Sequence, residues 1–205
     1  MAKIAALLSF RQPHSYRPAT PDPRTLARGG ITEILGDACS GRTSLSQWML
    51  TNATLGGEIS AVVDCHDAFD PVSARNAGVD LGKLLWVQCG HRLETALRAT
   101  DLILHAGGFG LIVLDLGDAT PAMLQRVPTS YWYRFQRAIE HTPSALVIIA
   151  RQAVARSSSV RQIDFKRQKI CWKGTAPFQT IDRLELQVAS RKPVSGVPLI
   201  VNVEK

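Results

Sequence analysis

The feature that most constrains the fold of this chain is a glycine-rich loop between an apolar run and a helical segment. The apolar run Ile31–Leu35 ends at Gly36, a second glycine follows at Gly41, and a pattern typical of a helix covers Thr43–Thr54. In a phosphate-binding loop of this spacing, the glycines let the backbone turn its N–H groups toward an anion, and the helix adds the positive end of its dipole. A strand before the loop and a helix after it are the context that the motif requires. We therefore expect a nucleotide site here.

The residues expected to bind the nucleotide belong to this loop and to the start of the helix: Gly36, Ser40, Gly41, Arg42, Thr43 and Ser44. The hydroxyl of Thr43 is placed to hold Mg²⁺. Arg42 stands where the motif has a lysine, and its guanidinium is planar, bulkier and stricter in geometry than an ammonium group. We expect a nucleotide affinity that is retained but weakened. The alternative is a relic loop that holds a sulfate ion or nothing.

A second part of the site is predicted at Leu111–Asp115, where four apolar residues end in an aspartate. At the carboxyl end of a buried strand, such a carboxylate binds Mg²⁺ through water. Asp115 and Thr43 are therefore the predicted metal residues. The alternative for Asp115 is a capping side chain on a buried strand.

Short apolar runs alternate with helical stretches as far as residue 150. Strands are predicted at Ile59–Asp64, Leu84–Gln88, Leu111–Asp115 and Ala145–Ala150, and helices at Arg92–Ala106, with Leu102 facing inward, and at Tyr131–Glu140. Strands that are apolar on both faces and separated by helices imply an α/β fold with a mostly parallel central sheet covered by helices on both faces. Polar and apolar residues then alternate over Val160–Trp172, Ile181–Ala189 and Val197–Val203, which predicts C-terminal antiparallel edge strands.

Two units are expected along the chain. Residues 1–28 form a short helix at Ile4–Phe10 and a proline-rich linker, and residues 29–205 form one core domain that includes the C-terminal antiparallel strands. No apolar run reaches the roughly 18 residues of a membrane span, so we expect a cytoplasmic protein without a membrane partner. The four cysteines show no paired ligand spacing, which predicts buried free thiols and no zinc site.

Charge is distributed unevenly. The net charge is +7, and residues 31–150 carry eight basic and twelve acidic residues, whereas residues 151–205 carry eleven basic and four acidic ones. A basic terminus on an acidic core suggests nucleic acid or an acidic partner protein, and the alternative is a solvated surface. The predicted DNA or partner surface consists of Arg151, Arg156, Arg161, Lys166, Arg167, Lys169 and Lys173. Phe165 and Trp172 lie among these cations, either to stack on bases or, as the alternation favours, to face the core.

The residues from Asp64 to Asp80, DCHDAFDPVSARNAGVD, resemble a segment of bacterial RecA recombinases in which a strand ends in an acidic cluster and leads to the pattern DP-x-x-A-R-x-x-G-V-D. With the phosphate loop and Asp115, the resemblance covers residues 29–150 in the same order and implies a RecA-like P-loop core. Within the RecA superfamily, SGRTSL, VDLGKLLWV, GGFGLIVLDLGD and SYWYRF are most similar to ImuA-type proteins. Those proteins are RecA-related accessory subunits of the translesion mutasome.

The resemblance also bears on catalysis. In RecA the acidic cluster supplies a glutamate that activates water; here His66 stands at the matching position, and a shift of one residue gives Asp67 instead. Because Arg42 replaces the lysine and His66 the glutamate, the resemblance implies weak or absent ATP hydrolysis. In RecA the next core strand ends in a nucleotide-sensing glutamine. Gln152 lies one position out of that register, and Arg151 is the alternative.

For partners, the resemblance implies an ImuB-type adaptor, which is an inactive polymerase-like protein, and an error-prone polymerase, in a DNA damage response near the nucleoid. ATP and Mg²⁺ are expected as weak ligands, and single-stranded DNA, RecA or a second copy of the chain as further partners. RecA grips DNA through flexible loops, one of which corresponds to the basic segment Arg151–Ser159. Four aromatic residues within Tyr131–Phe135 are expected to leave some rings exposed as a contact surface. The alternatives are a DNA-stimulated ATPase and a protein that caps RecA filaments.

Overall fold

The structure is a computed structural model that describes residues 26–175, 180–192 and 199–204. The predicted helix at Ile4–Phe10, and the linker as far as residue 25, lie outside the described residues. None of the helices within the described ranges is long and apolar enough to cross a lipid bilayer.

One sheet organises the part of the chain that the structure describes. Its eight strands are β1 (Gly30–Gly36), β2 (Ser60–Asp64), β3 (Leu84–Gln88), β4 (Leu111–Asp115), β5 (Ala145–Ala150), β6 (Ser159–Lys173), β7 (Thr180–Lys192) and β8 (Leu199–Glu204), in the order β3-β2-β4-β5-β1-β6-β7-β8. All neighbours from β3 to β6 are parallel, whereas β7 is antiparallel to both β6 and β8. The predicted fold class is confirmed. The alternating segment at Val160–Trp172 differs from the prediction in one respect, because β6 also pairs in parallel with β1.

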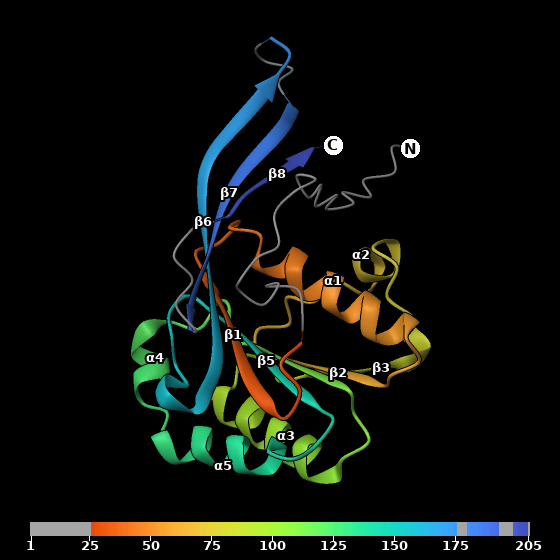
Figure 1. Cartoon of the computed structure of the whole chain (residues 1–205), viewed down its shortest axis with the longest axis vertical. Coiled ribbons are helices and arrows are strands. Elements are labelled where there is room, and N and C mark those ends of the chain that lie inside the picture. The colour runs from red at the N-terminus through yellow and green to blue at the C-terminus, as the bar shows by residue number, and fades with distance from the viewer. Residues whose placement is uncertain (1–25, 176–179, 193–198, 205) are drawn as a thin grey trace.

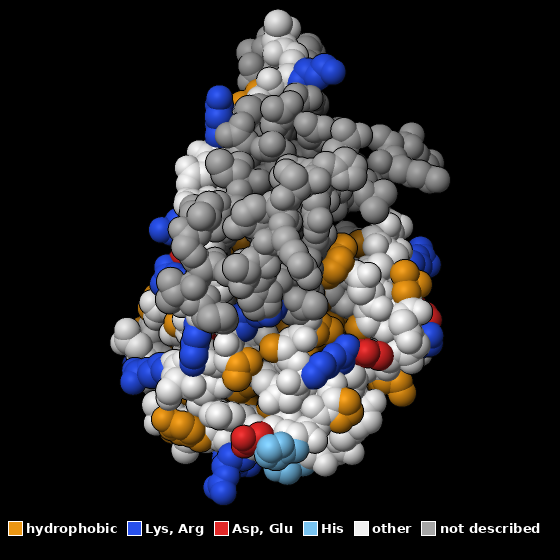
Figure 2. All heavy atoms as spheres, in the orientation of Figure 1, with side chains coloured by type: hydrophobic (Ala, Val, Ile, Leu, Met, Phe, Trp, Pro, Cys, Tyr) orange, Lys and Arg blue, Asp and Glu red, His pale blue; other side chains and the backbone are white. Residues whose placement is uncertain are grey.

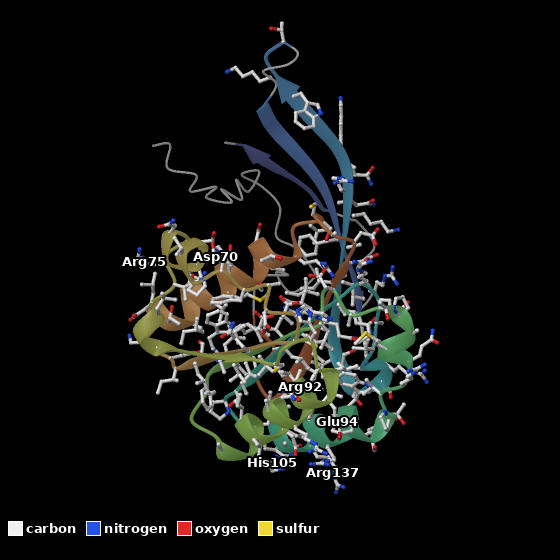
Figure 3. All side chains as sticks on the ribbon, turned by 180° about the vertical axis from the view of Figure 1, so that it is seen from behind. Asp70, Arg75, Arg92, Glu94, His105 and Arg137 are labelled. Atoms are coloured by element: carbon white, nitrogen blue, oxygen red, sulfur yellow. The ribbon has the colours of Figure 1, made fainter. Side chains whose placement is uncertain are left out.

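Helices cover both faces of the parallel part of the sheet (Figure 1). On one face lie α1 (Arg42–Leu55) and α2 (Pro71–Asn76), and on the other lie α3 (Leu93–Ala106), α4 (Pro121–Gln125) and α5 (Thr129–Ile139). Figure 3 shows the same division, with Asp70 and Arg75 beside α2 on one side and His105 and Arg137 of α3 and α5 on the other. Two short 3₁₀ helices cover Leu81–Lys83 and Arg156–Ser158. Helix α4 was not predicted, since five residues are too few to show a helical period.

The central strands β2, β4 and β5 are apolar at nearly every position because they serve two cores. In β2, Ala61 and Val63 belong to the core under α3 and α5, while Val62 belongs to the core under α1. Successive side chains of a strand point to opposite faces, so a strand covered on both sides has no face left for polar residues. This arrangement is the reason that continuous apolar runs identified the parallel strands from β1 to β5 correctly.

Three side chains lie differently from their predicted places. Leu102 is exposed, because the buried face of α3 includes the next two residues instead. Trp172 is 56% exposed, since β6 continues beyond the helical layers that cover the sheet. Cys39 is exposed in the phosphate loop, whereas Cys65 and Cys89 are buried free thiols as predicted.

Candidate nucleotide-binding site and basic hairpin

The phosphate loop connects the end of β1 to the start of α1. Gly36 has a φ of 152° and Gly41, the N-cap of α1, a φ of 96°, both in the region that favours glycine. A Cβ on Gly36 would lie 2.5 Å from the carbonyl oxygen of Phe165 and 2.6 Å from Ser40 Oγ. Residue 36 therefore has to be glycine for its conformation and for space.

This loop offers several donors to an anion. The first turn of α1 leaves backbone N–H groups without an intrahelical partner, and that turn contains no acidic residue to compete for them. Ser40 is only 2% exposed, and its hydroxyl has no hydrogen-bond partner among the residues that the structure describes. A buried hydroxyl without a partner is costly, so this group fits a loop that is completed by a ligand. Thr43 and Ser44 are exposed at the start of the helix.

A pocket of about 350 Å³ opens beside the loop. Four predicted site residues line it: Arg42 and Thr43 from α1, His66 after β2 and Asp115 at the end of β4. They converge because the carboxyl ends of parallel strands meet at one edge of the sheet. The deeper wall is apolar and is formed by Leu50, Val62, Val113 and Ile149.

Arg42 is the first residue of α1 and is buried, with 7% of its surface exposed. Its Nη1 atom donates to the carbonyl oxygen of Gly117, 3.3 Å away, in the connection that follows β4. The guanidinium therefore reaches across the pocket from one wall to the other. Burial lowers the pKa of Arg42, and the carboxylates of Asp115 and Asp118 oppose that shift. Arginine remains protonated in proteins, so the pocket contains a fixed positive charge.

Asp115 and the guanidinium of Arg42 both bond to the backbone of Gly117. Asp115 Oδ1 accepts a hydrogen bond of 2.8 Å from the backbone N–H of Gly117. A Cβ on Gly117 would lie 3.0 Å from Asp115 Oδ1 and 3.3 and 3.4 Å from Nη2 and Nη1 of Arg42. Burial raises the pKa of the Asp115 carboxyl, and the hydrogen bond from Gly117 and the charge of Arg42 act in the opposite direction.

The acidic cluster after β2 separates into a structural part and a part that faces the pocket. Asp64 is fully buried and accepts hydrogen bonds from three backbone N–H groups and from the indole Nε1 of Trp86, so it shapes the turn. Asp67 accepts a bond of 3.4 Å from the N–H of Gly90, away from the pocket wall. Of the two predicted catalytic residues, the structure thus brings only His66 to the pocket. The His66 ring lies edge-on to the ring of His91, with centroids 5.5 Å apart.

The site fits phosphate groups but does not fit Mg²⁺ at the predicted place. The donors of the loop and the fixed charge of Arg42 all suit an anion. Mg²⁺ requires near-octahedral oxygen ligands at about 2.0–2.1 Å. A guanidinium instead lies close to Asp115, next to the same glycine; it has no lone pair for a metal ion and repels a dication. Thr43 and Asp115 both line the pocket, and the side chain of Arg42 lines it with them.

Arg151, which follows β5, bonds to the same carbonyl oxygen as Arg42. Arg151 Nε donates to the carbonyl oxygen of Gly117 at 3.3 Å, and its Nη2 atom lies 4.0 Å from Asp118 Oδ1. One carbonyl oxygen thus accepts from two arginines. Gln152, the other predicted sensor, is exposed in the following bend.

Sequence reasoning missed Glu33, which controls the segment expected to be a flexible DNA-binding loop. Glu33 lies in the middle of β1 and is fully buried. Its carboxylate accepts hydrogen bonds from the N–H groups of Val154 and Ala155, at 2.7 and 2.8 Å, and from Gln162 Nε2 at 2.7 Å. The expectation for Arg151–Ser159 is therefore corrected, because the backbone of its centre is buried and fixed to the sheet. The available signal was a glutamate inside an otherwise apolar strand.

The predicted basic surface is divided by the structure. Arg161 is buried, with 9% exposed, and does not lie on this surface. Residues 166–169 are all exposed, so both faces of β6 are open to solvent there. Together with β7 this part of β6 forms a hairpin that projects from the body (Figure 1), and Figure 2 shows Lys and Arg side chains along it. The exposed members of the set are Arg151, Arg156, Lys166, Arg167, Lys169 and Lys173, joined by the exposed ring of Trp172.

Comparisons with known proteins agree with this fold. Residues 24–124 match the model of the RecA N-terminal domain. The chain is 32% identical to Protein RecA of Leifsonia xyli subsp. xyli over 138 residues, which cover 60% of this chain and 38% of the relative. Over 90 residues it is 40% identical to Protein RecA of Chlorobaculum tepidum, covering 44% of this chain and 26% of the relative. With Protein RecA of Thermotoga petrophila it shares 42% identity over 88 residues, covering 43% and 24%.

The chain therefore aligns with only 24% to 38% of the length of these relatives. The aligned part includes the phosphate loop, the acidic turn and Asp115, all within the matched residues 24–124. The family match and these relatives therefore show that the matched part of this chain is similar to RecA proteins.

Proposed function

We propose that this chain is an ImuA-like accessory subunit of an error-prone translesion DNA synthesis complex in the DNA damage response. In this role it binds an inactive, ImuB-type polymerase-like adaptor, which recruits the error-prone polymerase, and it contacts single-stranded DNA through its basic hairpin. It binds ATP weakly and hydrolyses it slowly or not at all. It works in the cytoplasm, at the nucleoid.

The observation that carries the proposal is the position of Arg42. Phosphoryl transfer depends on a positioned cation and on a base or water-orienting group, and losing either lowers the rate by orders of magnitude. Here the cation is held on the carbonyl of Gly117, and the group that faces the pocket after β2 is His66. Such a site supports binding better than turnover.

In this proposal the hairpin of β6 and β7, rather than the loop after β5, contacts the DNA. Glu33 accepts two buried hydrogen bonds from the backbone at the centre of that loop, which limits the freedom of the loop to wrap a strand of DNA. The hairpin instead presents cations and the exposed indole of Trp172 without a covering layer. Cations bind phosphates and aromatic rings stack on bases, which together suit single-stranded nucleic acid.

A surface for the adaptor is offered by α5. Its aromatic cluster divides as expected: Trp132 and Phe135 are buried, whereas Tyr133 is 52% exposed and bonds to Ser157 Oγ at 3.0 Å. A second pocket, of about 260 Å³, lies here between α5 and the 3₁₀ helix Arg156–Ser158. An exposed tyrosine beside a pocket is typical of protein interfaces.

The test combines partner binding with turnover. The full chain is mixed with the ImuB-type adaptor encoded in the same genome, and the complex is measured by size exclusion, for the wild type and for Tyr133→Ala. Phosphate release from ATP is measured with and without single-stranded DNA. A stable complex that Tyr133→Ala weakens, with no DNA-stimulated turnover, is the expected result. The same columns, run with RecA and with the chain alone, measure the other two protein contacts.

The second candidate is a DNA-stimulated ATPase of the RecA superfamily. It is favoured by the placement of His66 on the pocket wall, where a neutral imidazole can accept a proton from water. Turnover that DNA stimulates and that His66→Ala abolishes, together with failure to bind the adaptor, would replace the first proposal by the second.

A further inference from the structure

We propose that this chain binds the phosphates of a nucleotide without a divalent metal ion, because the guanidinium of Arg42 takes the place of that ion beside Asp115. The inference rests on the nucleotide site proposed above and specifies the chemistry by which that site holds its ligand.

The first support is the location of the guanidinium. Arg42 Nη1 is fixed by the carbonyl oxygen of Gly117, and both terminal nitrogens lie within 3.4 Å of the point where a Gly117 Cβ would stand. Asp115 Oδ1 lies 3.0 Å from the same point. The guanidinium and the carboxylate therefore border the same glycine, Arg42 supplies a positive charge close to Asp115, and burial limits the freedom of Arg42 to leave.

The second support is the chemistry of the group. A divalent ion in such a site offsets the negative charge of the phosphates and links them to the aspartate. A guanidinium carries a permanent positive charge and presents several N–H donors in one plane, which pair well with phosphate oxygens. Lysine is a compact charge on a flexible stem and leaves more room for an ion, whereas the guanidinium of Arg42 is a larger, planar fork of donors.

The third support comes from the anion side of the pocket. The buried Ser40 hydroxyl lacks a partner within the described residues, and the start of α1 offers free N–H groups. These donors and Arg42 belong to the same loop and helix start, so one phosphate group can contact both. None of these contacts requires a metal ion.

The experiment measures binding of ATP that carries a methylanthraniloyl fluorophore, by fluorescence anisotropy, to the full chain. One series contains excess MgCl₂ and the other contains EDTA. We expect the wild type to bind equally in both, within about twofold. Arg42→Lys frees space beside Asp115 and removes the planar donor pair, so its binding in EDTA falls by about tenfold and MgCl₂ restores it.

Two further variants keep the result interpretable. Arg98→Lys, on the exposed surface of α3, makes the same change away from the pocket and is expected to bind as the wild type does. Asp115→Asn removes the negative charge that faces Arg42, so it tightens binding in EDTA. If Asp115 instead held a metal ion, this variant would lose binding specifically in MgCl₂. Circular dichroism of each variant confirms that it is folded.

The possible outcomes separate this inference from the proposed function. Wild-type binding that is about tenfold or more tighter in MgCl₂ than in EDTA overturns the metal-free site and leaves the nucleotide site standing. Absence of binding in both series overturns the inference together with the nucleotide part of the proposed function. The adaptor complex is measured separately, so its presence or loss does not depend on either result.

Discussion

Replacing Glu33 by alanine is the perturbation for which the structure gives the clearest magnitude. The carboxylate of Glu33 accepts from Val154 N, Ala155 N and Gln162 Nε2. In Glu33→Ala the two backbone N–H groups remain buried with no acceptor, whereas Gln162 keeps its bond to Ser159 Oγ. Each orphaned buried donor costs about 1–3 kcal/mol. We therefore expect the free energy of unfolding to fall by about 2–6 kcal/mol, a large share of the usual 5–15 kcal/mol.

Glu33→Gln separates the hydrogen bonds from the charge. Its amide oxygen still accepts from both backbone N–H groups, and the amide of Gln162 can flip to accept from the new NH₂ group. The expected loss is about 1 kcal/mol, from replacing a charged acceptor by a neutral one. Glu94→Ala is the matched control, because Glu94 is exposed on α3 and pairs only at the surface with Arg98. Its effect is expected to stay within about 0.5 kcal/mol.

Urea denaturation followed by circular dichroism gives these free energies, and amide hydrogen exchange checks their origin. In Glu33→Ala the amides of Val154 and Ala155 are expected to lose protection before the strands do. Loss of less than about 0.5 kcal/mol in Glu33→Ala, or equal losses in the alanine and glutamine variants, would refute the view that this carboxylate anchors the loop.

Three further predictions follow from other parts of the molecule. Trp172→Ala is expected to weaken the binding of single-stranded oligonucleotides by about 1–3 kcal/mol, because the variant loses the stacking of the exposed ring on a base. Fluorescence anisotropy measures the binding, and unchanged binding counts against the hairpin as a DNA surface. Asp115→Asn is expected to raise stability increasingly between pH 4 and pH 7, because burial raises the pKa of Asp115 above its usual value of 3.8 and the folded state loses stability as this carboxyl ionises. Urea titrations at both pH values test this, and a difference that does not change with pH contradicts it. A thiol reagent at pH 8 is expected to label the exposed Cys39 long before Cys65, since burial raises the pKa of Cys65 to about 12 and keeps its thiol protonated. Peptide mass mapping measures the two labelling rates. Equal rates would contradict the prediction and show that the end of β2 opens readily.

The parallel half of the fold could be predicted because its determinants are local. Apolar runs predicted the strands, and the spacing of the glycines predicted the loop that joins β1 to α1. Convergence of Arg42, His66 and Asp115 at one edge of the sheet then followed from topology. The length of β6 and its parallel pairing with β1 did not follow, since strand pairing depends on contacts distant in sequence.

The details of the site depend on geometry that a sequence pattern does not contain. The pattern showed an arginine in place of a lysine, but the contact of Arg42 with the carbonyl of Gly117 required the fold. His66 and Asp67 are adjacent in sequence and both were candidate bases, yet the turn after β2 directs only His66 to the pocket wall. Glu33 was overlooked because its partners lie more than a hundred residues further along the chain.

The continuity of β6 has a practical consequence for building chimeras. The first part of β6 pairs with β1 as far as the pair Gly36 and Phe165. The residues of β6 that follow belong to the exposed hairpin. The backbone of Phe165 is also the surface against which the phosphate loop is packed at Gly36. An exchange of hairpins between related proteins should therefore be spliced after Phe165 rather than at the start of β6 at Ser159. A junction placed earlier would exchange a wall of the nucleotide loop together with the hairpin, and the two effects would be confounded.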